Sequence, residues 1–123
     1  MESNLEGEAR SKVELLMPIM NEMSDEELRA EVGVLAMGER ALDPQTDASL
    51  ATMSSAADDI LRRVRDVVCD NRQNISDTLS VPNVASIVAL LAGVFGISAL
   101  PIGLVALAVL ILRMGLNEYC RNS

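Results

Sequence analysis

The sequence contains no histidine and no tryptophan, and Phe95 and Tyr119 are its only aromatic residues. Without an imidazole, no Ser-His or Cys-His pair can activate a nucleophile, and no histidine can bind zinc. Cys69 and Cys120 are too far apart to form a CxxC unit, and no glycine-rich phosphate loop follows a strand pattern. We therefore predict that the protein is not an enzyme and that it has no catalytic, cofactor-binding or metal site.

Basic residues are also scarce, and lysine occurs only once, at Lys12. Residues 1–80 contain 17 acidic and 8 basic side chains, a net charge of −9, whereas residues 81–123 contain one acid and two bases. Phosphate binding needs clustered Lys and Arg, so this balance argues against nucleic acid as a partner. It also argues against residues 1–80 lying on an anionic membrane surface.

Two cysteines are too few for the disulfide framework that stabilises many small secreted domains. We predict two free thiols in a reducing compartment. The alternative is S-acylation of Cys120, which lies just beyond a long apolar segment.

Charge is absent from residues 81–112, a segment of 32 residues that is apolar around its whole circumference. One straight helix of that length would measure about 48 Å, whereas the hydrocarbon core of a bilayer is about 30 Å thick. Near the middle of the segment, Ser98, Pro101 and Gly103 form a cluster that is typical of a turn. We predict a hairpin that turns at these three residues. A two-span hairpin, a re-entrant hairpin and one long kinked span all remain open.

The first arm of this hairpin carries a stripe of small residues at three- and four-residue spacing: Ala85, Ala89, Ala92, Gly93 and Gly96. In lipid, helices associate where small residues let their backbones approach closely. We predict that the stripe is a helix-packing face in the membrane, directed at the second arm or at another copy. The alternative is that Ala and Gly are simply frequent in membrane helices. The absence of charge within the arms argues against a transporter or a selective channel.

The acidic region contains two helical patterns before its best periodic segment. The first covers about residues 5–23, and Pro18 is expected to break or kink it near Met17, where a break would leave two short pieces. The second begins at a capping box, in which the Ser24 hydroxyl accepts from the Glu27 amide while Glu27 reaches back. It ends before Pro44, which disfavours helical geometry in the preceding residue.

A third helix is predicted from about residue 46 to residue 74. Its apolar residues alternate steps of three and four, as heptad a and d positions do: Leu50, Met53, Ala57, Ile60, Val64 and Val67. This interaction seam docks either on the first two helices of the same chain or on another copy or a helical partner. Asp58 and Asp59 are expected to pair with Arg62 and Arg63 at i,i+4 spacing.

Together these patterns predict an all-α fold. About three amphipathic helices in residues 1–80 form a small acidic bundle or interaction region. Residues 81–123 form a hydrophobic helical hairpin with a short polar tail, which we predict to be transmembrane. Arg72 precedes the hairpin and Arg113 and Arg121 follow it, whereas its turn is uncharged. This distribution favours a membrane protein whose N-terminal region and C-terminus are both cytosolic.

We expect a non-enzymatic integral membrane protein whose acidic helices mediate self-association or bind a helical partner at the bilayer. An apolar hairpin behind amphipathic helices is broadly similar in architecture to that of pore-forming colicins. The similarity covers the C-terminal third, and it implies a membrane-perturbing protein whose hairpin oligomerises in the bilayer. A third hypothesis is a soluble helical protein that buries the hairpin in its core or in an oligomer interface, because uncovered apolar arms would aggregate in water.

Overall fold

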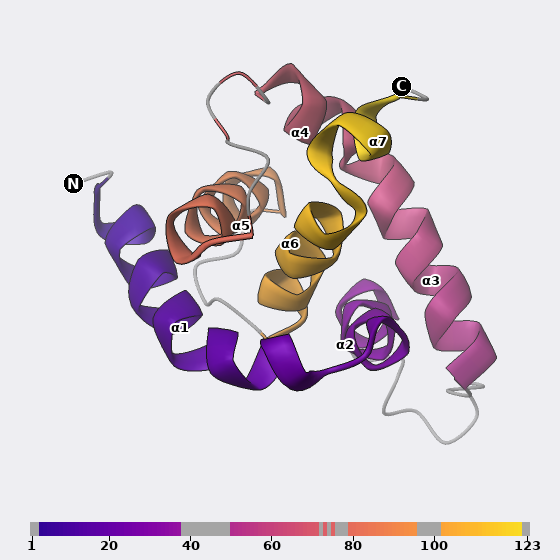
Figure 1. Cartoon of the computed structure of the whole chain (residues 1–123). Coiled ribbons are helices and arrows are strands. Elements are labelled where there is room, and N and C mark those ends of the chain that lie inside the picture. The colour runs from indigo at the N-terminus through magenta and orange to yellow at the C-terminus, as the bar shows by residue number, and fades with distance from the viewer. Residues whose placement is uncertain are drawn as a thin grey trace.

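The computed structural model describes residues 3–37, 50–71, 73, 75, 79–95 and 102–121. These residues form seven α-helices and no strand, which confirms the predicted all-α fold (Figure 1). The helices are α1 (Ser3–Glu22), α2 (Asp25–Met37), α3 (Leu50–Arg63), α4 (Arg65–Asp70), α5 (Val81–Phe95), α6 (Ile102–Met114) and α7 (Leu116–Cys120).

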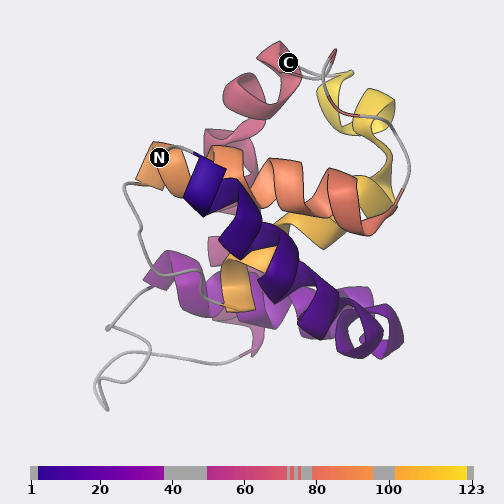
Figure 2. The same cartoon turned by 90° about the vertical axis from the view of Figure 1, so that its left-hand side faces the viewer.

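Helix α6 lies at the centre of the molecule. All ten residues from Gly103 to Leu112 are buried, as expected for a segment that is apolar on every side and must be covered on every side. Helices α1, α2, α5 and α7 contact it, and Figures 1 and 2 show it enclosed between them in two perpendicular views. The second arm of the predicted hairpin is therefore the core of this fold.

The first turn of α6 crosses α2 at backbone distance. A Cβ atom added at Gly103 would lie 2.7 Å from both the Glu31 carbonyl oxygen and the Leu35 Cβ. Only a residue without a side chain fits this crossing. Gly103, which the sequence places in the hairpin turn, thus lies inside α6 and sets its approach to α2.

Helix α5 buries one face and exposes the other. It packs on α1 and α6, and its buried side chains are Val84, Ala85, Ile87, Val88, Leu91 and Ala92. Val94, near its C-terminal end, remains 49% exposed. The first arm is therefore half covered in this conformation.

Helix α1 continues through Pro18 as one helix, so of the two predicted alternatives, a break and a kink, the break is wrong. Its axis bends along its length (Figure 1), as proline kinks allow without ending a helix. One face contributes Ala9, Val13, Met17 and Met20 to the core. That packing explains why the helix tolerates the loss of the backbone hydrogen bond that proline cannot donate.

The third predicted helix is two helices in the structure. Helix α3 ends at Arg63 and α4 begins at Arg65, with Val64 (φ −92°, ψ −2°) at the junction. Helix α3 lies along α2, and Val64 is buried in the core. The prediction of one continuous helix as far as residue 74 is therefore wrong. The bend brings α4 to the C-terminal helix α7.

Among the described residues, no helix combines the length and the apolar character that crossing a bilayer requires. Helices α5 and α6 contain 15 and 13 residues. The transmembrane hairpin is thus not shown by the structure, and it stays a prediction.

Candidate functional site

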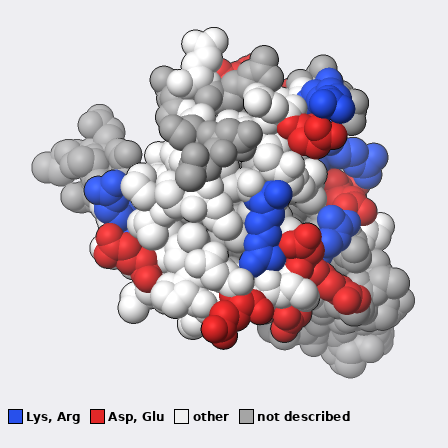
Figure 3. Space-filling view, viewed as in Figure 1, with Lys and Arg blue, Asp and Glu red and all other residues white. Residues whose placement is uncertain are grey.

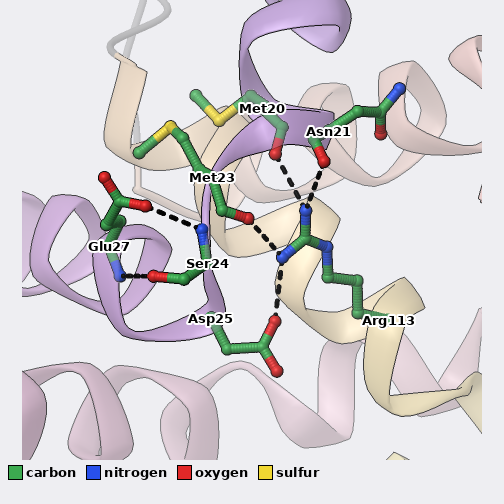
Figure 4. Close-up of polar contacts among 7 residues, drawn as sticks. All are labelled: Met20, Asn21, Met23, Ser24, Asp25, Glu27 and Arg113. Atoms are coloured by element: carbon green, nitrogen blue, oxygen red, sulfur yellow. Dashed lines mark hydrogen bonds and ion pairs between the residues drawn. The ribbon is translucent and has the colours of Figure 1, made fainter.

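One charged residue, Arg113, follows the apolar segment directly, in the last turn of α6. Its side chain reaches the corner where α1 ends and α2 begins (Figure 4). The Nη1 group donates to the carbonyl oxygen of Met23 at 2.8 Å and to Asp25 Oδ1 at 2.9 Å. The Nη2 group donates to the carbonyl oxygens of Met20 at 2.8 Å and Asn21 at 3.5 Å. We call this set of contacts the Arg113 clamp.

The chemistry of the corner explains the clamp. The last carbonyl groups of a helix have no partner within the helix and form the negative end of its dipole. A guanidinium group carries a permanent charge and five donors in a fixed plane, so it can satisfy several carbonyls together. Arg113 therefore caps the C-terminus of α1 from a helix about ninety residues later in the sequence, and its side chain remains only 20% exposed.

The start of α2 supplies the other half of the corner. The Glu27 amide donates to Ser24 Oγ at 3.1 Å, and the Ser24 amide donates to Glu27 Oε1 at 2.9 Å. These two bonds confirm the predicted capping box. The backbone and side-chain hydrogen bonds from Ser24 lower the pKa of the Glu27 carboxyl from its usual value. A rigid start to α2 fixes where Asp25 meets Arg113.

A second polar cluster lies where α7 meets α3 and α4. The buried Tyr119 hydroxyl donates to the carbonyl oxygen of Leu61. Burial raises the pKa of Tyr119 to about 12. The Arg65 guanidinium lies 5.5 Å from the centroid of the Tyr119 ring, within cation–π range. Tyr119 thus anchors the C-terminal helix to the bundle.

Cys69 and Cys120 form a disulfide, so the prediction of two free thiols is wrong. The bond joins α4 to α7, with 5.7 Å between the two Cα atoms. It also occupies the thiol of Cys120 that S-acylation would require. Nothing in the 51-residue separation indicates this pairing, because it depends on the bend at Val64 and on the docking of Tyr119.

The small residues of the predicted packing face have different environments. Ala85 and Ala92 are buried, and Ala89 is partly buried against the core. Gly93 is exposed, with nothing within 4 Å of an added Cβ. Gly96 lies outside the described residues. The stripe therefore does not act as one contact surface within the described part of the chain, and its role in a membrane stays a prediction.

The residues of the predicted turn and seam are only partly described. Ser98 and Pro101 lie outside the described residues, and the environments of the Leu50 and Met53 side chains are likewise not described. Ala57, Ile60 and Val64 of the seam are buried in the core of the same chain, and Val67 is partly buried. At these positions the seam serves intramolecular packing.

The described residues present no group of three or more His, Cys, Asp or Glu side chains that could hold a metal ion. Their polar clusters join helices: the Arg113 clamp holds α6 to the α1–α2 corner, and Tyr119 with the disulfide holds α7 to α3 and α4. Comparison with family models, curated proteins and solved structures gave no match to this chain.

Proposed function

We propose that this protein is a non-enzymatic helical protein that acts at a lipid bilayer, and that the folded bundle stores an apolar hairpin for insertion. The observation that carries the proposal is the location of the uncharged segment. Its second helix, α6, is buried from Gly103 to Leu112 and is covered by the acidic helices α1 and α2. The interior of a lipid bilayer also covers such a helix on all sides.

Storage and insertion are physically compatible in this fold. Releasing α6 into water would cost roughly 1.5–3 kcal/mol for each large apolar side chain, so the hairpin cannot leave the bundle in water. Transfer from protein to lipid avoids that cost because both surroundings are apolar. The Arg113 clamp contributes polar contacts that must then break. Arg113 would exchange the carbonyls of α1 for lipid headgroups.

The tip of the hairpin supports first contact with a membrane. Val94, near the end of α5, and Ile102, at the start of α6, are 49% and 46% exposed. This end of α5 points away from the viewer in Figure 1 and lies at the left of Figure 2. Figure 3 draws the opposite face, on which a broad uncharged area over α1 and the start of α5 is bordered by charged side chains. The acidic helices would remain at the surface, where the exposed Leu15 and Ile19 of α1 offer contacts to another copy or to a helical partner.

The test uses Val94→Arg with Val94→Leu as its control. Because Val94 is half exposed, the folded bundle tolerates arginine there. Inside a bilayer, the same change costs about 3 kcal/mol, or about a hundredfold in the insertion equilibrium. We expect full-length protein and Val94→Leu to float with liposomes and to resist carbonate extraction. Val94→Arg should keep the same melting temperature in water and lose flotation.

A second candidate is a permanently folded interaction protein, which the complete burial of α6 favours. It predicts no carbonate-resistant flotation for any variant, and that result would overturn the membrane proposal. Dye release from the liposomes that bind the protein would separate the two membrane roles. Release that grows steeply with bound protein supports a pore-forming assembly, and binding without release supports an anchor.

A further inference from the structure

A groove of about 380 Å³ opens between α2, α3, α7, the start of α4 and the end of α6. Its apolar lining comes from Leu61, Met114 and Tyr119. Its polar lining is Arg29, Asp58, Arg62 and Arg65. The groove is separate from the Arg113 clamp and has no role in the function proposed above.

The charge of this groove is opposite to that of the protein. Three guanidinium groups and one carboxylate line it, in a chain whose formal net charge is −8. The sequence does not reveal this cluster, because Arg29 comes from α2 and the other two arginines come from α3 and α4. A local excess of positive charge on an acidic protein is a place where an anion, and not a cation, gains energy.

Arg65 is the central residue of the argument. Within the part of the chain that the structure describes, its side chain has neither a hydrogen-bond acceptor nor an ion-pair partner, and its Nε atom is shielded from solvent without a bond. Among the described residues, the guanidinium contacts the ring of Tyr119. A partly buried permanent charge without an acceptor is costly, and a bound anion would offset that cost.

The other two arginines are held by carboxylates that face water. Arg29 pairs with Asp58, and Arg62 pairs with Asp59 at 2.7 Å, and both aspartates are exposed. Ion pairs of this kind contribute little free energy. These pairs keep the guanidinium groups beside the groove.

We propose that the groove binds a phosphate group, either of a small phosphomonoester or of a lipid headgroup. Phosphate fits better than a single carboxylate because three guanidinium groups can serve several oxygens and a charge near −2. The apolar lining from Leu61, Met114 and Tyr119 would contact the carbon part of the ligand. The Cys69–Cys120 disulfide fixes the helix that carries Tyr119, and it thereby positions the ring against Arg65.

The test follows the Nε–Hε signal of Arg65 by NMR in the oxidised full-length protein. The backbone amide signals of Leu61 and Tyr119, which line the groove, report binding in every variant. The probes are inorganic phosphate and glycerol 3-phosphate, and, by sedimentation, vesicles of phosphatidylglycerol or phosphatidylcholine. Arg65→Gln removes the central guanidinium. Arg63→Gln is the matched control, because it makes the same change of charge at an exposed residue that does not line the groove.

We expect saturable shifts of the Arg65 signal and a loss of affinity of at least about tenfold in Arg65→Gln, since each charge-assisted bond is worth more than one decade. Arg63→Gln should stay within about twofold of wild type because surface charges act weakly.

Saturation by the soluble phosphates identifies a small ligand. Binding confined to phosphatidylglycerol vesicles and dependent on Arg65 identifies a headgroup. No shift with any probe, or equal losses in the two variants, would overturn the proposal. Because Arg65→Gln leaves the hairpin unchanged and Val94→Arg leaves the groove unchanged, the two proposals fail separately.

Discussion

At the scale of single residues, two glycines on the apolar segment illustrate how local geometry decides the effect of one methyl group. An added Cβ at Gly103 would lie 2.7 Å from the Glu31 carbonyl oxygen and from the Leu35 Cβ, whereas Gly93 has open space around it. Backbone atoms cannot move aside as the end of a flexible side chain can. The same substitution therefore has opposite consequences at the two positions.

We expect Gly103→Ala to lower the free energy of unfolding by about 1–3 kcal/mol, because α6 must move away from α2. Gly93→Ala should leave stability unchanged or raise it by up to about 1 kcal/mol, because alanine is the better helix former. Urea denaturation followed by circular dichroism measures both. Equal stability of the two variants would show that α6 does not cross α2 as closely as described.

Arg113 is the second residue at which a single side chain decides a contact between distant parts of the chain. We expect Arg113→Gln to lower the free energy of unfolding by about 2 kcal/mol, because carbonyls of α1 lose charge-assisted donors. Asp25→Asn should cost less than about 0.5 kcal/mol, because the Asp25 side chain is 70% exposed. Chemical denaturation of the pair separates capping of α1 from the ion pair. A larger effect at Asp25 would mean that the ion pair, and not the carbonyl contacts, holds the corner.

At the scale of helices, the sequence predicted some contacts correctly and missed others. The capping box at Ser24 and Glu27 was predictable because both partners lie within one turn. The ion pair of Asp58 was not predictable, because an i,i+4 rule considers only partners on the same helix. In the structure Asp58 pairs with Arg29 of α2, and Asp59 pairs with Arg62 at i,i+3. The predicted pairs of Asp58 with Arg62 and of Asp59 with Arg63 are replaced by these contacts.

The same distinction explains the remaining helix predictions. Periodicity located the buried face of α3 at Ala57 and Ile60, but it cannot show that Pro18 is tolerated or that Val64 interrupts a helix. Both outcomes depend on tertiary packing, which overrides local propensity. The Arg113 clamp and the groove around Arg65 combine residues from helices that are far apart in sequence. No spacing rule could have found them.

The link between α4 and α7 is the most direct test of element-scale packing. We expect Cys69→Ser to lower the free energy of unfolding by about 4 kcal/mol, the loop-closure contribution for cysteines 51 residues apart. Dithiothreitol should bring wild type to the stability of the variant and leave the variant unchanged. Thermal denaturation with and without the reductant measures this. An equal response of both proteins to the reductant would contradict the disulfide.

At the scale of the whole molecule, the question is whether residues 1–80 form an independent bundle, as the sequence predicts, with the hairpin as an appendage. The contacts of the helices argue for one shared core. Helix α1 packs mainly on α5, and α2 packs on α6 as well as on α3. The buried Val13 of α1 and the buried Leu28 and Val32 of α2 belong to the same cluster as the residues of α6. Removing residues 81–123 would expose much of that cluster.

We therefore expect a fragment of residues 1–80, carrying Cys69→Ser to prevent dimers, to lack a cooperative thermal transition and to bind a hydrophobic dye. Its acidic helices lose the surface that orders them, and isolated helices of this length are marginal in water. The oxidised full-length protein is the control and should melt cooperatively. A fragment that melts cooperatively would establish the independent bundle and would make the hairpin a separable membrane anchor. A fragment that does not melt cooperatively means that insertion of the hairpin must also loosen α1 and α2. Membrane binding would then be coupled to rearrangement of the whole protein, and the strength of the Arg113 clamp would help to set how readily it occurs.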